Sequence, residues 1–263
     1  MKIHKTATIS NLAQIDSSVE IGQNVIIEGN VKIDKNVKIL PNVYIGDGTT
    51  IEEGTVIHMG AIIGHVPQDY AYKGGKSFTK IGKNNIIREY VTIHRATDEG
   101  ASTVIGDNVF LMVQVHVAHN VVIENSVIVA NGSILAGHMY VEKGAFISGN
   151  VVFHQFCRVG RYAMIGGFSG VNKDVPPYML VRGPSTIRGI NLIGLRRANF
   201  SKEVIREIKE AYKMLFLSDM TMEESLEKME KTLLSDEAKH FIDFVKNSKR
   251  RICKIRFSKE EFF

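Results

Sequence analysis

The stretch VIIEGN-VKIDKN-VKILPN-VYIGDG, residues 25–48, repeats one six-residue unit with an aliphatic residue at the third place of each. Steps of six from Ile3 to Val171 visit 29 positions, of which 25 are Ile, Val or Leu and one is Phe153. Three positions depart from the rule: Asp69, Gly75 and Glu99. A small or β-branched residue usually follows each aliphatic four places later. Such a fixed short period is typical of a β-helix, in which three hexads form one triangular coil.

The period therefore predicts a mainly β fold, a parallel β-helix with its aliphatic residues pointing into the coil. In two stretches the aliphatic residues are lost, although the count of six resumes unchanged after each of them. They are residues 64–76, which are polar and contain Pro and Gly, and residues 95–103. We expect both to be loops that leave a corner of the coil, because surface loops of this kind often carry binding groups. The alternative is that each is a tolerated insertion.

The hexads end after Asp174-Val175-Pro176-Pro177-Tyr178, which predicts two domains, a β-helix over 1–178 and a connecting segment with helices over 179–263. Ser201 can cap a helix whose apolar stripe runs to Phe216. The pattern Thr221-Met222-Glu223-Glu224 is a capping box for a second helix, and a third is expected from Asp236 to Lys249. This small helical domain would also cover one end of the β-helix, where strand edges would otherwise be exposed.

Composition restricts the class of protein. No apolar run approaches 20 residues, so no membrane span is expected, and the N-terminus lacks a signal-peptide pattern. Two cysteines, Cys157 and Cys253, do not make a disulfide framework. Together these features favour a cytoplasmic protein.

Positive charge gathers near the C-terminus of a chain whose net charge is +5. The cluster comprises Lys246, Lys249, Arg250, Arg251, Lys254 and Arg256. It is either a solvated tail or a docking patch for an acidic partner. Nucleic acid is the less favoured partner, because no aromatic residues interleave the cluster in a recognised motif.

Four histidines fall close together when positions are counted in coils of 18 residues: His116, His119, His138 and His154. Successive coils are about 4.8 Å apart, so these side chains should line one edge over three coils. Taken singly, each is more often a surface or packing histidine. A zinc site would need three or four converging ligands, and no Cys or acidic residue joins the set in phase. The stripe favours a general base with hydrogen-bonding groups for an extended substrate, and no metal.

Five segments carry a resemblance to a known family: Ile93-His94-Arg95, His116-Val117-Ala118-His119, Leu135-Ala136-Gly137-His138, His154-Gln155-Phe156-Cys157 and Asp174-Val175-Pro176-Pro177-Tyr178. With them the chain resembles, over essentially its whole length, the acyl-carrier-protein-dependent UDP-N-acetylglucosamine O-acyltransferases of lipid A biosynthesis. The hexads alone indicate only a hexapeptide-repeat protein, a large class of acyltransferases and others.

The resemblance implies a left-handed β-helix and a homotrimer with sites between neighbouring subunits. It implies that His119 is the general base for the sugar 3-position and that the backbone N–H of Gly137 holds the oxyanion. The implied substrate-binding set is Gln68, Asp69, His116, Asn120, His138, His154, Gln155, Asn191 and Arg197. Gly167 matches the position that limits acyl length. The donor is the phosphopantetheine thioester of acyl carrier protein, the acceptor is a UDP-sugar, and no cofactor is implied.

Three residues depart from the family pattern. Asn120 stands where an Asp usually lies beside the base, Ala71 where a Lys is common, and Ile193 where well-known members have Glu. These departures leave open whether the acceptor carries a 3-hydroxy or a 3-amino group. Because Asp69 lies nearly three coils before His119 in sequence, we expect its loop to reach the site of a neighbouring subunit.

Three alternative functions remain. The sister N-acyltransferase of the same pathway has an additional N-terminal domain, for which hexads starting at Ile3 leave no room. An acyltransferase that uses coenzyme A or another sugar would explain the hexads but not the Gln68-Asp69 loop. A catalytically silent scaffold would not need the set of His119, Gly137 and His138.

Overall fold

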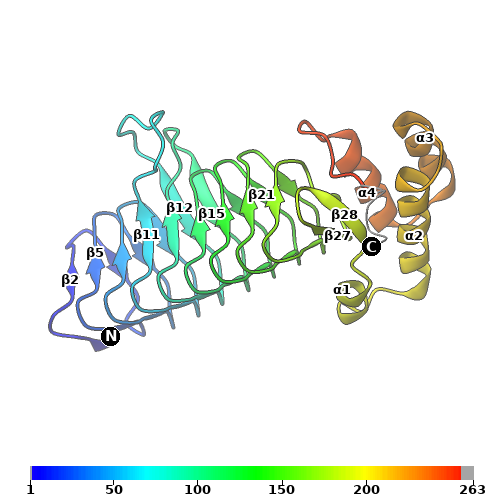
Figure 1. Ribbon diagram of the computed structural model, residues 1–263. Helices are drawn as coiled ribbons and strands as arrows, with labels where there is room; N and C mark the ends of the chain where they lie inside the picture. Colours follow the sequence, from blue (N-terminus) through cyan, green and yellow to red (C-terminus); the bar gives the residue numbers. More distant parts are fainter. Residues whose placement is uncertain (1, 256–263) are drawn as a thin grey trace, which may run out of the picture.

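The computed structural model describes residues 2–255, and most of them form a triangular column of parallel strands (Figure 1). The chain visits three sheets in turn, and each strand pairs with the strand one coil later. The first sheet has 11 strands: β1 (Lys2–Ile3), β4 (Glu20–Ile21), β7 (Lys38–Ile39), β10 (Val56–Ile57), β13 (Ile86–Ile87), β16 (Phe110–Leu111), β19 (Ile128–Val129), β22 (Phe146–Ile147), β25 (Met164–Ile165), β27 (Met179–Arg182) and β28 (Thr186–Ile190).

The second sheet has nine strands: β2 (Thr8–Ile9), β5 (Ile26–Ile27), β8 (Tyr44–Ile45), β11 (Ile62–His65), β14 (Thr92–His94), β17 (His116–Val117), β20 (Ile134–Leu135), β23 (Val152–Phe153) and β26 (Gly170–Val171). The third has eight: β3 (Gln14–Ile15), β6 (Lys32–Ile33), β9 (Thr49–Ile51), β12 (Phe78–Ile81), β15 (Ser102–Ile105), β18 (Val122–Ile123), β21 (Tyr140–Val141) and β24 (Arg158–Val159). The predicted β-helix is thereby confirmed.

The core is the axis of the column, as the period predicts. Ile27 and the preceding Val25 are both buried, and the same pair repeats in coil after coil. The rule fails only at the N-terminal end, where Ile3 is 43% exposed. Within residues 2–255, β1 is the edge strand of its sheet, so the inward side chain of Ile3 has a described neighbour on one side only, and burial becomes complete from the second coil onward.

Both pattern lapses are loops outside the coil. Ile62 pairs with Thr92, and Thr92 pairs with His116, so these partners are 30 and 24 residues apart and not 18. The additional residues project from one edge of the column (Figure 1). This difference matters for the site, because counting by 18 misplaces every residue that precedes the loops.

The C-terminal part is helical: α1 (Leu192–Arg197), α2 (Lys202–Phe216), α3 (Met222–Thr232) and α4 (Asp236–Lys246). Ser201 caps α2, and the Thr221 capping box is present at α3, as predicted. The third predicted helix is three residues shorter than expected. It ends at Lys246 because Asn247 caps it and Ser248 turns back to donate to Asp174 in the last coil.

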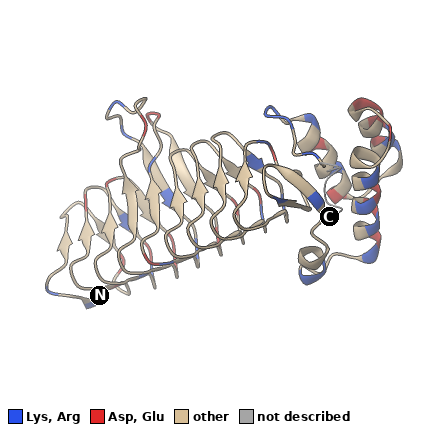
Figure 2. Cartoon of the chain, in the orientation of Figure 1, with Lys and Arg blue, Asp and Glu red and all other residues tan. Residues whose placement is uncertain are grey.

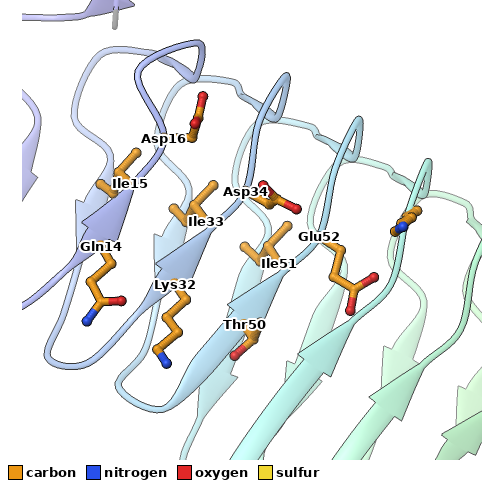
Figure 3. Close-up of a pocket in the computed structure, with 10 residues that line it drawn as sticks. Gln14, Ile15, Asp16, Lys32, Ile33, Asp34, Thr50, Ile51 and Glu52 are labelled. Carbon is orange, nitrogen blue, oxygen red and sulfur yellow. The ribbon is translucent and has the colours of Figure 1, made fainter.

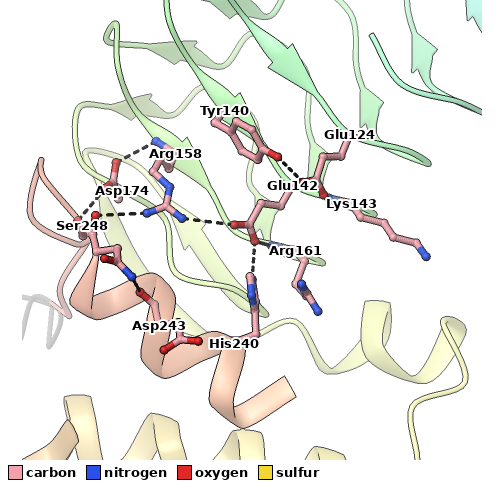
Figure 4. A network of polar contacts seen from close by, with 11 residues as sticks. Glu124, Tyr140, Glu142, Lys143, Arg158, Arg161, Asp174, His240, Asp243 and Ser248 are labelled. Atoms are coloured by element: carbon pink, nitrogen blue, oxygen red, sulfur yellow. Dashed lines mark hydrogen bonds and ion pairs between the residues drawn. The ribbon is translucent and has the colours of Figure 1, made fainter. Parts of the chain in front are cut away.

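The helices sit against the last coils at one end of the column (Figure 1). Glu142 of the column joins them: its carboxylate accepts from Nε2 of His240 at 2.7 Å and pairs with Arg158 at 3.5 Å (Figure 4). Burial alone would raise the pKa of Glu142, but the contacts with His240, the Arg161 backbone and Arg158 hold it below its usual range. Cys157 and Cys253 are buried free thiols.

No helix within residues 2–255 is long and apolar enough to cross a membrane.

Candidate active site

The turns after β17, β20 and β23 stack at one corner of the column. The N–H of His138 donates to the carbonyl of His119, and the N–H of Phe156 donates to that of Gly137, each at 3.0 Å. His119, Gly137 and Gln155 therefore occupy one position in three successive coils, and Asn120, His138 and Phe156 occupy the next. This stacking places His119, His138 and His154 at the same corner, with His116 on the adjoining strand β17.

His119 is the centre of the site. Its side chain is only 8% exposed, and both ring nitrogens face oxygen atoms. Nδ1 lies 3.0 Å from Oδ1 of Asn120, and Nε2 lies 3.1 Å from Oδ2 of Asp69. Asp69 is held for this contact by an Asx turn in which its Oδ1 accepts the N–H of Ala71 at 2.7 Å.

Asp69 reaches His119 of its own chain, and the expectation that its loop must serve a neighbouring subunit is wrong. Only two coil steps separate the strand before the loop from the strand of the base, since Ile62 pairs with Thr92 and Thr92 with His116. The 64–76 loop spans that distance along the corner. The separation of Asp69 and His119 in sequence appeared to be nearly three coils because it includes the additional residues of the two loops.

Gly137 is the residue that His119 packs against. A Cβ at this position would lie 2.5 Å from Cε1 and 2.6 Å from Nε2 of the imidazole, closer than a real contact allows. Glycine is thus required for the ring to approach the backbone. Among residues 2–255, no acceptor takes the Gly137 N–H, which leaves a donor beside the base.

His138 occupies a left-handed backbone position with φ of 60°. Many corners of the column fill the equivalent position with Asn or Gly, which tolerate it better than His does. Its ring stacks on Phe156 at a centroid distance of 4.6 Å and meets the edge of His119 at 5.0 Å. The same conformation occurs at Tyr90, Phe156 and Tyr162, so it belongs to the corner of the coil and does not by itself mark a functional residue.

Sequence counting missed two further histidines, His65 and His94. Their rings continue the row along the corner: His65 lies 6.4 Å from His94, which lies 5.0 Å from His116. The loops shift them out of phase with the other four, so only the strand pairing of His65 with His94 reveals the row.

Three histidines of the row, His94, His116 and His138, have pKa values below the ordinary value. Burial, and then repulsion from neighbouring histidines, lowers the pKa of His94 to about 4. Burial and then His119 lower the pKa of His116 and of His138 in the same way. Nδ1 of His116 is bonded to the Thr92 hydroxyl at 2.7 Å, whereas Nδ1 of the buried His94 has no partner within the described residues.

Two polar residues of the second loop also belong to the site, although the sequence singled them out only as part of a loop. Thr97 donates its N–H and its hydroxyl to Oδ1 of Asn120, each at 2.9 Å. Asp98 accepts from Nδ2 of Asn120 at 3.1 Å.

The remaining predicted residues lie away from these contacts. Gln68, His154, Gln155 and Arg197 are exposed, and Arg197 ends α1. Asn191 is buried as the N-cap of α1: its Oδ1 accepts from Gly194 at 3.0 Å and its Nδ2 donates to the Tyr162 carbonyl at 2.9 Å.

The predicted acyl-limiting residue lines a surface groove. Gly167 shares this groove with Phe168, Leu180 and Arg182. Its φ is not positive, so a tight turn does not explain the glycine. The groove leaves room beside the backbone for a ligand chain.

A second groove on the first coils lacks the chemistry of the histidine corner (Figure 3). Its edge carries Asp16, Asp34 and Glu52, but the carboxylate of Asp16 accepts from Ser18 and that of Asp34 from Lys35. No histidine lines it. Within residues 2–255, no group of three or more His, Cys, Asp or Glu is arranged to hold a metal ion.

Comparisons with known proteins show which family the chain is similar to. Residues 174–253 match the family model for the second domain of UDP-N-acetylglucosamine O-acyltransferase, and residues 26–58 and 102–137 match the bacterial transferase hexapeptide model. The chain is 48% identical over 256 residues, 96% of its length and 99% of the relative's, to the acyl-[acyl-carrier-protein]–UDP-N-acetylglucosamine O-acyltransferase of Thermodesulfovibrio yellowstonii.

Solved structures are similar as well. The UDP-N-acetylglucosamine acyltransferase of Francisella novicida has a TM-score of 0.92 at 39% identity, covering 96% of this chain and 94% of its own. That of Moraxella catarrhalis has a TM-score of 0.92 at 36% identity, covering 96% and 100%. The likeness confirms the left-handed winding that the resemblance implied. The chain belongs to the UDP-N-acetylglucosamine O-acyltransferase family.

Proposed function

We propose that this protein transfers a 3-hydroxyacyl chain from acyl carrier protein to the glucosamine 3-position of UDP-N-acetylglucosamine, the first step of lipid A biosynthesis. The observation that supports it best is the placement of His119. Asn120 holds one nitrogen of the imidazole, and the other lies beside the backbone of Gly137, whose N–H has no acceptor within residues 2–255. A base and an oxyanion donor side by side are what acyl transfer to a hydroxyl requires.

In the proposed reaction, Nε2 of His119 removes the proton of the sugar 3-hydroxyl as that oxygen attacks the thioester carbonyl. The N–H of Gly137 then donates to the oxyanion of the tetrahedral intermediate. Collapse of the intermediate breaks the C–S bond, and the imidazolium returns its proton to the departing thiolate. The products are the 3-O-acyl sugar nucleotide and acyl carrier protein with a free thiol, without a cofactor or a covalent enzyme intermediate.

Asp69 has a role in substrate entry. Its carboxylate now lies 3.1 Å from Nε2 of His119, the atom that must face the sugar hydroxyl. The acceptor therefore has to take the place of Asp69, whose carboxylate is then free to accept from another sugar hydroxyl. His116, His138 and Gln155 are proposed to contact the sugar nucleotide, His154 to lie near the acyl chain, and Asn191 with Arg197 to hold the nucleotide end. The side chain and the backbone N–H of Asn191 are already engaged, so this contact would use its carbonyl, which accepts from Leu195 and has a second lone pair.

The donor protein is proposed to dock on the helical end. Lys202, Arg206 and Lys209 of α2 are exposed at helical spacing on one face, continued by Lys213 (Figure 2). Such a stripe attracts an acidic partner. The tail cluster suits this role less well, because Lys246 is paired with Glu230 and Arg250 donates to the Asn172 carbonyl. Arg256 lies outside the described residues. Because acyl carrier protein is the proposed donor, a cytoplasmic location is proposed with it.

A homotrimer is proposed from the outer face of the first sheet. Its outward residues form one apolar ladder of adjacent strands: Val56, Ile86, Phe110, Ile128, Phe146, Met164 and Leu180. The same face carries Lys2, Glu20 and Lys38 in the first coils. A continuous apolar face of this length favours a partner subunit over water. The histidine corner joins the second sheet to the third, on the opposite side of the column from this face, so a site shared between subunits would need contacts on the second or third sheet as well.

The test is transfer of a labelled 3-hydroxyacyl group to UDP-N-acetylglucosamine and to its 3-amino analogue, from acyl carrier protein and from coenzyme A. Transfer from acyl carrier protein to either sugar supports the proposal. The ratio of the two transfer rates shows which UDP-sugar is the preferred acceptor. Efficient transfer from coenzyme A only, or no transfer to either UDP-sugar by folded protein, contradicts it.

A further inference from the structure

Beyond His119 itself, the site contains a chain of three side chains that ends in a carboxylate. Nδ1 of His119 lies 3.0 Å from Oδ1 of Asn120, and Nδ2 of Asn120 donates to Oδ2 of Asp98 at 3.1 Å. Asp98 belongs to the 95–103 loop, outside the coil that carries the base. The structure thus brings a negative charge to the far side of the amide that contacts the imidazole.

Two contacts fix which way the Asn120 amide faces. Its oxygen accepts the Thr97 N–H and hydroxyl, both at 2.9 Å, so the oxygen cannot be exchanged with the amino group without losing the backbone donor. Its amino group faces Asp98, an acceptor only. The Asn120 backbone is fixed as well, because its N–H donates to the Thr103 hydroxyl at 2.9 Å.

The orientation of this amide decides the tautomer of His119. With Oδ1 toward the ring, Nδ1 must carry a hydrogen; Nε2 faces Oδ2 of Asp69 in the substrate-free protein, so its lone pair serves as a base once the acceptor hydroxyl has displaced Asp69. A reversed amide would present N–H groups to Nδ1 and place the hydrogen on Nε2. The ring could not then accept a proton from the side on which Asp69 and Gly137 lie.

We propose that Asp98 is a positioning residue for the base: through Asn120 it holds His119 in the Nδ1–H tautomer and supports the imidazolium that forms during acyl transfer. This role deepens the proposed function and rests on it. It gives a base whose direct partner is an uncharged amide a carboxylate one residue further from the ring.

The proposal is tested by a double-mutant cycle between positions 98 and 120. Asp98→Ala should lower kcat/KM by about tenfold, the usual order for a group that orients a catalytic side chain. Asn120→Asp places a carboxylate directly beside Nδ1. The new carboxylate would be repelled by the carboxylate of Asp98. Asp98→Ala should therefore cost nothing, or raise kcat/KM, in the Asn120→Asp background. An equal loss in both backgrounds overturns the proposal.

The matched control is Glu99→Ala, the exposed acidic neighbour of Asp98 in the same loop. It should leave kcat/KM unchanged, and the melting temperatures of Asp98→Ala and Glu99→Ala should agree, since both side chains are exposed on the same surface loop. If Glu99→Ala is as damaging as Asp98→Ala, loop order and not the contact with Asn120 is responsible.

The pH profile adds a second readout. The groups facing His119 are Asp69, His94, His116 and His138, with Asp98 behind Asn120. Removing the Asp98 charge withdraws support from the imidazolium, so the acid limb of kcat/KM should move to lower pH in Asp98→Asn while the plateau falls. An unmoved limb contradicts the charge effect.

A measurement without turnover separates this proposal from the general-base assignment. The ¹⁵N shifts of His119, recorded above the pH at which the ring loses its charge and in an Asp69→Ala background so that no carboxylate faces Nε2, should report the Nδ1–H tautomer when Asp98 is present and a mixture when Asp98→Ala is added. The same tautomer in both proteins overturns the proposal. If instead His119→Ala retains activity, the base assignment fails whatever the tautomer result.

Discussion

Nε2 of His119 lies 3.1 Å from Oδ2 of Asp69, a residue of a loop that leaves the column two coils earlier. The contact joins the base to the part of the site expected to receive the sugar, and it does so within one chain. Both nitrogens of His119 therefore have oxygen partners before substrate binds, and the proposed reaction begins by exchanging Asp69 for the acceptor hydroxyl.

His119→Ala should lower kcat/KM by about 10² or more, the usual size of a general-base contribution. Initial rates of acyl transfer measure it, with circular dichroism to show that the column is intact. Near-normal transfer by the folded variant would remove His119 from the role of base.

A mixture of His119→Ala and Asp69→Ala chains should remain as inactive as either variant alone, because one chain supplies both residues. The chains are unfolded together, refolded and assayed, and a mixture of His119→Ala with the unaltered protein serves as the control for assembly. Recovery of activity in the double-variant mixture would show that the Asp69 loop acts on a neighbouring subunit after all.

Gly137→Ala should abolish most activity, since its methyl group would collide with Cε1 and Nε2 of His119 and push the ring from its place. The matched control is Gly170→Ala, in β26, where an added Cβ meets no atom within 4 Å. If Gly137→Ala and Gly170→Ala are equally active, the close approach of the ring to residue 137 is not needed for catalysis.

Gly167→Met should shift the preference to shorter acyl donors if the groove beside Phe168 receives the end of the acyl chain. A Cβ at Gly167 would meet the Gly149 carbonyl at 3.2 Å, so Gly167→Ala is measured alongside to separate strain from obstruction. Competition between donors of different length gives the ranking. An unchanged ranking in folded Gly167→Met would place length control elsewhere.

Acid should destabilise the protein through His94. Its pKa is about 4 in the folded chain and 6.5 when unperturbed, so the unfolded chain binds more protons between these values. The contribution of His94 to the free energy of unfolding is complete above pH 6.5 and is lost as the pH falls toward about 4. Urea unfolding across this range should give a shallower pH dependence for His94→Gln; equal slopes would contradict the assignment.

The sequence by itself determined the fold. A six-residue period needs only local chain geometry and burial of one side chain per hexad, so the period alone places Ile27 and its equivalents in the core. The helix caps at Ser201 and Thr221 could also be predicted from neighbouring residues, because each depends on hydrogen bonds between residues three apart in sequence. The predicted boundary at residue 178 remains a prediction; the first sheet continues past it through β27 and β28.

The assembly of the site was decided by tertiary structure. Counting by coils brought His119 and His138 to one corner, but two loops of unequal length removed His65 and His94 from that count. No local rule states where a loop closes, so the contacts of Asp69 and Asp98 with the site could not be read from the chain. Periodic burial fixes the column residue by residue, whereas the loops are fixed only by what they meet when they fold back onto it.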